Sequence, residues 1–145
     1  MTDSTVLHEL TELVRLHRYS LLRYIADADP YGDPGVLESL RQMGDMQDAT
    51  AGRLESLILD RDGPLPTGDY PAEFAAYHDL SLDYLLPLVT AHQRALVQRI
   101  EDALPHLTRD AEARAVVEEA LGEAIGHLET LEEWQGKRQP AAKAT

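Results

Sequence analysis

The chain contains no cysteine, which excludes disulfides, thiolate zinc sites and thiol catalysis. Lysine is almost absent as well: it occurs only at Lys137 and Lys143, and 26 acidic against 13 basic side chains give a formal net charge of −13. This balance argues against nucleic-acid binding, which needs a basic surface. No apolar run approaches the ~20 residues that span a bilayer, and the N-terminus lacks a secretion-signal pattern. We therefore expect a cytoplasmic protein that binds neither nucleic acid nor membranes.

Leucine and alanine, both strong helix formers, occur 23 and 18 times, against 11 valines and isoleucines together. Turn residues separate four helix-length segments, which cover residues 4–28, 34–59, 71–104 and 108–136. In an alternative reading, 71–79 forms a separate short helix. The sequence predicts an all-α fold, with one domain over residues 1–138 and a flexible tail over residues 139–145.

The predicted helices are joined by a short, a long and a short connection. Residues 60–70 contain two glycines and two prolines and are long enough to run along the side of a bundle. A single long crossover is required in four-helix bundles of the ferritin-like type, whereas simple up-down bundles need none.

Every predicted helix carries a polar residue near the middle of its apolar face. At 100° per residue, these inward positions are His17, Gln47 with Thr50, Gln93, and His127. A polar group in a core costs a few kcal/mol unless it is hydrogen-bonded, so polar residues at matching depth predict a shared layer. Two interpretations stay open: a hydrogen-bonded network that fixes the helix register, and a pocket for a metal or a small molecule.

The register of these residues resembles the ferritin-like superfamily. In that superfamily the first helix carries a metal-binding Glu with a Tyr seven residues later, the second and fourth carry Glu-x-x-His, and the third carries one Glu. The matching residues here are His17 and Tyr24, Gln47 and Thr50, Gln93, and Ala124 and His127. The resemblance implies a four-helix bundle with a long crossover between the second and third helices.

The ligand set departs from this family pattern. The four Glu positions read His17, Gln47, Gln93 and Ala124, so no bridging carboxylate remains for a di-iron centre. We therefore expect a degenerate di-iron site and a non-catalytic binding or structural protein without catalytic residues. Its expected buried polar pocket comprises His17, Tyr24, Gln47, Thr50, Gln93 and His127.

A second registration matches Tyr19 to the family tyrosine. It makes Glu12 the first carboxylate, with Asp83 and Glu123 as further candidates. Glu12 lies opposite the apolar stripe of its helix, so we reject this registration on geometry.

Two narrower resemblances involve the same helices. Leu16-His17 and Asp48-x-x-Ala51-Gly52-Arg53 are similar to the Dps mini-ferritins, although Gly52 replaces the required Glu. The pattern His17-x-x-Ser20-x-x-x-Tyr24 is similar to a group of bacterial ferritin-like proteins and implies no particular activity.

The rival function is iron handling or atypical metal oxidation. Iron or zinc would then be bound by His17 and His127 together with a carboxylate from a neighbouring subunit. Several large apolar residues lie off or at the margin of the central stripes. We expect some of them to cover the crossover or the helix ends, and the rest to form an exposed patch and hence a homo-oligomer, either a dimer or a larger assembly. These residues are Leu13, Leu16, Leu22, Leu37, Tyr77, Leu80, Tyr84 and Leu88.

Overall fold

The computed structural model describes the backbone of residues 4–143 and the side chains up to Lys137. All regular elements in this range are helical, which confirms the all-α prediction. They are α1 (Ser4–Arg18), α2 (Leu21–Ala28), α3 (Pro34–Asp60), η1 (Ala72–Tyr77), α4 (Leu82–Ala103), η2 (Leu104–Leu107) and α5 (Ala111–Lys143). The alternative reading of a separate short helix in 71–79 is thereby confirmed by η1.

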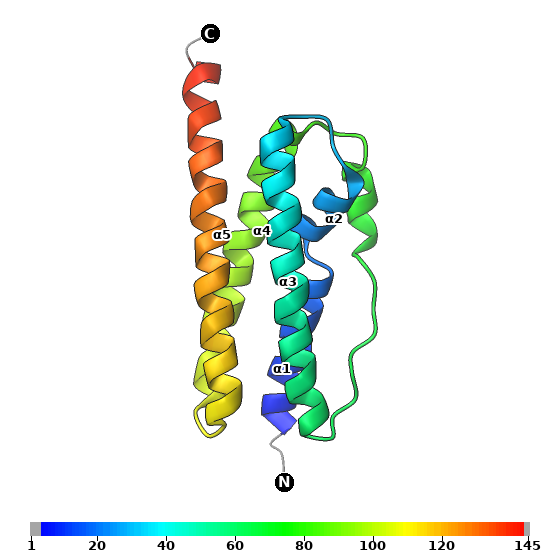
Figure 1. The fold of residues 1–145 in the computed structure, drawn as a ribbon, viewed down its shortest axis with the longest axis vertical. Coiled ribbons are helices and arrows are strands. Elements are labelled where there is room, and N and C mark those ends of the chain that lie inside the picture. Colours follow the sequence, from blue (N-terminus) through cyan, green and yellow to red (C-terminus); the bar gives the residue numbers. More distant parts are fainter. Residues whose placement is uncertain (1–3, 144–145) are drawn as a thin grey trace.

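The helices lie side by side along one long axis (Figure 1). In this view α1 and α2 follow one another upward, α3 and α4 run downward, and α5 runs upward. The connection that leaves α3 returns along the side of the molecule to η1 at the opposite end, so α3 and α4 are parallel. No helix within residues 4–143 is both long and apolar enough to cross a membrane.

The first predicted helix, 4–28, is wrong as a continuous element because the structure divides it at Tyr19 and Ser20. Ser20 has an extended backbone (φ −70°, ψ 154°), and its hydroxyl accepts a hydrogen bond from the Arg23 amide at 3.0 Å. Ser20 is therefore the N-cap of α2, and the chain restarts its helix there.

The last helix is longer than the sequence indicates. It continues to Lys143, so residues 139–143, which we predicted as part of a flexible tail, have helical backbone. The remainder of that tail, residues 144–145, lies outside the described residues.

The hydrophobic core consists of two separate clusters. One lies around α1, the second half of α3, the second half of α4 and the start of α5. The other contains α2, the first half of α3, η1, the start of α4 and Leu131 of α5. The polar residues at the middle of the helices occupy the boundary between them.

Most of the apolar residues expected to cover the crossover or to form an exposed patch are buried or half-buried, so the predicted broad patch is wrong. Leu13 and Leu22 are fully buried and Leu37 nearly so, because each helix contacts neighbours on more than one side. Of the eight residues, only Leu16 and Tyr84 are exposed, while Tyr77, Leu80 and Leu88 are half-buried against the second core cluster.

Candidate functional site: a polar layer between two core clusters

The five polar residues expected on the inward faces are all buried. His17, Gln47, Thr50, Gln93 and His127 each expose 7% or less of their surface. They come from α1, α3, α4 and α5, so every long helix contributes to the layer.

Tyr24, the sixth residue of the expected pocket, lies elsewhere. It is half-buried, and its ring packs against Tyr70 at 5.2 Å and Phe74 at 5.7 Å between centroids. Tyr24 thus belongs to an aromatic cluster that fixes the long connection and η1 against α2.

Neutral side chains form a continuous hydrogen-bonded chain across the layer. The Ser20 hydroxyl donates to Gln47 Oε1 at 2.6 Å, and Gln47 Nε2 donates to Gln93 Oε1 at 3.4 Å. Gln93 Nε2 in turn donates to the carbonyl of Ala124 at 3.1 Å. The chain therefore links the α1–α2 break to α3, α4 and α5 without any charged group.

Thr50 connects the layer to a carboxylate that the favoured registration did not include. Its hydroxyl lies 2.9 and 3.0 Å from the two oxygens of Glu123, and Arg53 Nη2 donates to Thr50 Oγ1 at 3.0 Å. Burial raises the pKa of Glu123, against the opposing effects of the Thr50 hydroxyl and the Arg53 charge.

Two buried imidazoles complete the layer. His17 Nδ1 lies 2.7 Å from the carbonyl of Leu13, which fixes the proton on Nδ1 and leaves Nε2 as an acceptor. Within the described residues, His17 Nε2 and both ring nitrogens of His127 are buried without a hydrogen-bond partner.

Both histidines are held in the neutral form. Burial lowers the pKa of His17, partly offset by the Leu13 carbonyl. Burial also lowers the pKa of His127, and the charge that His17 would carry when protonated lowers it further. Burial thus favours the neutral form of both imidazoles.

Asp48, which belongs to the pattern similar to the Dps mini-ferritins, is paired with arginines rather than left free for a metal ion. Its carboxylate pairs with Arg18 at 3.3 Å and with Arg23 at 3.0 Å, and Arg18 also binds Glu55. These arginines neutralise the carboxylate charge that an iron site would need.

The residues of the layer do not fit a di-iron centre. In the part of the chain that the structure describes, no three His, Asp or Glu side chains gather so that they could hold a metal ion. At the positions of the family's carboxylates lie an imidazole, two hydrogen-bonded amides and an alanine. Bridging two cations requires carboxylate charge that this set lacks.

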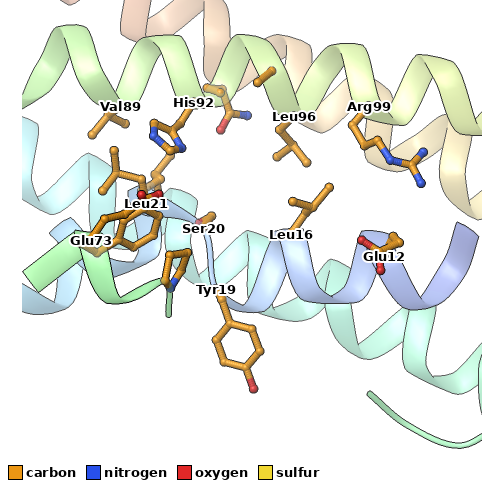
Figure 2. A pocket seen from close by; sticks show the side chains of 15 residues that line it. Glu12, Leu16, Tyr19, Ser20, Leu21, Glu73, Val89, His92, Leu96 and Arg99 are labelled. Atoms are coloured by element: carbon orange, nitrogen blue, oxygen red, sulfur yellow. The ribbon is translucent and has the colours of Figure 1, made fainter. Parts of the chain in front are cut away.

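A cavity of about 470 Å³ opens beside the layer, between the α1–α2 break, η1 and α4 (Figure 2). Ser20 and Gln93 lie in its wall, and of the six predicted pocket residues only Gln93 lines it.

Two polar residues of this region, Ser20 and Glu123, were not among the predicted site residues. Ser20 was visible only as part of the His-x-x-Ser-x-x-x-Tyr pattern. Glu123 was named only as a further carboxylate of the rejected registration. It lies one helical turn before His127, a spacing that places both on one face of α5.

Comparison of the chain with protein-family models and with curated proteins finds no match. Any functional assignment therefore depends on the geometry of the layer and of the cavity.

Proposed function

We propose that this is a non-catalytic binding or structural protein of the ferritin-like type, with a degenerate di-iron site. In this proposal α1 and α2 together are the first helix of a four-helix bundle, and residues 61–81 are its long crossover. The observation that carries the proposal is the neutral hydrogen-bonded chain through Ser20, Gln47 and Gln93.

In this proposal glutamine replaces glutamate at positions 47 and 93, which explains how the helices can stay together without a bound metal ion. Each replacement removes one negative charge and adds an amide N–H donor, so the side chains can bond to one another. Gln47 accepts from Ser20 and donates to Gln93, so both ends of this amide have partners. The chain through Ser20, Gln47 and Gln93 then fixes the relative positions of the helices, because these three side chains satisfy one another.

The proposed environment is the cytoplasm, and the proposed assembly is a homodimer, because two-fold dimers are the commonest oligomers of soluble proteins. Exposed apolar residues remain for such a contact, including Tyr31 at 89% and Tyr84 at 62% exposed. The Tyr31 backbone lies at the start of α4, since the Leu82 amide donates to the Tyr31 carbonyl at 2.8 Å.

A second candidate function is the binding of one iron or zinc ion by His17 and His127. Its specific support is the set of three buried imidazole nitrogens without partners, on rings that are neutral and therefore able to ligate. The third ligand would be a carboxylate from a neighbouring subunit, because no third His, Asp or Glu side chain within the described residues gathers with these two histidines.

Thermal unfolding with EDTA, and then with excess Zn(II) or Fe(II) under anaerobic conditions, separates the two functions. A ligand that binds only the folded state raises the melting temperature, so the leading proposal predicts the same value in all three conditions. A rise with either metal that disappears in His127→Ala, while Gln93→Leu keeps it, would instead establish the metal-binding function.

A further inference from the structure

The cavity beside the α1–α2 break has the size and the walls of a small-molecule site. Its volume of about 470 Å³ lies within the range of ~300–1,000 Å³ that such sites span. Leu16 and Leu96 point toward each other across it in Figure 2, and Leu21, Val89 and Phe74 line the part near η1. The apolar walls thus come from three separate segments of the chain.

The Ser20 and Gln93 side chains in the cavity wall already have hydrogen-bond partners inside the protein, whereas the ring of His92, also in the wall, packs against Phe74 and is exposed. The Ser20 hydroxyl donates to Gln47 and accepts from the Arg23 amide, and Gln93 Nε2 donates to the Ala124 carbonyl. An occupant therefore needs no polar group to satisfy the Ser20 and Gln93 side chains.

The charged groups lie at the rim, and two of them are paired. Glu12 accepts from Arg15 at 2.9 Å, and Arg99 binds the buried carboxylate of Glu9 at 2.7 Å. Glu73, also at the rim, is exposed to solvent. A charged occupant would lose its hydration in the apolar part without gaining a buried counter-ion.

We propose that this cavity binds one neutral, mainly apolar small molecule with the bulk of a two- or three-ring aromatic compound. A second copy of the chain is a poorer fit, since 470 Å³ would accommodate only about one turn of a helix roughly 10 Å across. The proposal is independent of the metal question, because neither His17 nor His127 lines the cavity.

The probe for the test is 1-aminoanthracene, a neutral three-ring amine whose fluorescence increases in apolar surroundings. We expect saturable binding of one probe per chain with a Kd below about 100 µM. Three naphthalenes then compete for the site: neutral 2-naphthol, anionic 2-naphthoate and cationic 2-naphthylmethylammonium. The neutral compound should displace the probe at concentrations at least tenfold lower than either charged one.

Variants with a larger side chain in the cavity wall test whether the probe binds in this cavity. Ala95 is an exposed residue of α4 in the cavity wall, and Leu16 lies on the opposite side, so Ala95→Trp and Leu16→Trp should each weaken probe binding at least tenfold. Ala115→Trp is the matched control: Ala115 is an exposed alanine of α5 outside the cavity wall, and this variant should bind like the wild type. Circular dichroism verifies that all three variants are folded.

Several results would overturn the proposal: no saturable fluorescence change, equal binding by the filled variants and the control, or better displacement by a charged naphthalene. A sedimentation experiment can give a further result that would overturn the proposal. If Ala95→Trp converts a dimeric wild type into a monomer, the occupant is a second copy and the small-molecule proposal is wrong.

Discussion

The hydrogen bond between the Gln47 and Gln93 amides has a measurable energetic signature. If the two amides satisfy each other, removing one leaves the other buried without a partner, whereas removing both leaves an apolar contact. The size of this difference separates a cooperative network from polar residues that merely share the same depth.

We predict that Gln93→Leu lowers the free energy of unfolding by about 1–3 kcal/mol, because it strands Gln47 Nε2. The double variant Gln47→Leu/Gln93→Leu should lose much less than the sum of the two single changes. Urea unfolding at pH 7.5 measures all four proteins. Two equally mild single variants whose effects add would show that the residues do not depend on each other.

The buried histidines predict a pH dependence with a defined sign. Burial lowers the pKa of both His17 and His127 in the folded state below the ordinary 6.5, so the unfolded chain binds more protons as the pH falls below that value. Stability is therefore fully present above about pH 6.5 and is lost as the pH falls, by at most about 1.4 kcal/mol per pH unit for each histidine.

Urea unfolding between about pH 7.5 and 5.5 tests this prediction in the wild type and in His17→Leu/His127→Leu. The double variant should lose less stability on acidification. Glu123, whose raised pKa acts in the opposite direction at lower pH, is common to both proteins. Parallel pH curves for the two proteins would show that the imidazoles are not shielded from water.

At the scale of elements, the break between α1 and α2 shows the limit of periodicity as a guide. Leu21 and Ile25 continue the apolar stripe of α1, so the pattern alone predicts one helix over residues 4–28. A serine can lie inside a helix or cap one. Here the tertiary partner of Ser20 determines that it caps α2. That partner is Gln47 on α3, a contact over 27 residues that local sequence cannot reveal.

Ser20 therefore has two functions, and its replacement should cost more than the loss of a cap. We predict that Ser20→Ala lowers the free energy of unfolding by about 1 kcal/mol for the lost cap, and by a further ~1–3 kcal/mol because Gln47 Oε1 loses its donor. Ser81→Ala is the matched control, since Ser81 caps α4 through the Tyr84 amide and is exposed. Equal losses in the two variants, measured by urea unfolding, would contradict a role for Ser20 in the layer.

At the scale of the whole molecule, helical periodicity was sufficient for the all-α class and for the burial of the five polar residues. Each of these residues lies in a stripe of apolar neighbours three or four positions away, so burial of the stripe buries the polar residue too. The same stripes did not predict correctly which apolar residues are exposed to solvent. Leu13 and Leu22 lie at their margins, and the structure buries both because helices pack on several sides.

The division of the core into two clusters could not be predicted from the stripes alone. Each stripe indicates which side of a helix is buried, and only the packing of four long helices shows that the polar residues meet at one level. The cavity also depends on this packing, because it forms where α1 and α2 are interrupted beside α4.

The proposed homodimer has a direct test. Two copies of the 16.1 kDa chain have a mass of about 32 kDa, and sedimentation equilibrium at micromolar concentration should give this value. Tyr84→Asp, which places a charge at one of the exposed aromatic residues, should shift the mass toward that of the monomer. A wild-type mass of 16 kDa at the highest concentrations would contradict the dimer.

The central claim, that a neutral hydrogen-bonded layer has replaced a metal centre, is tested most directly by elemental analysis. The protein is purified without tag or chelator, loaded with Fe(II) under anaerobic conditions, desalted and analysed for bound metal. We predict less than about a tenth of an equivalent per chain both before and after loading, because the layer lacks bridging carboxylates. About one equivalent that is lost in His17→Ala and in His127→Ala would contradict the claim.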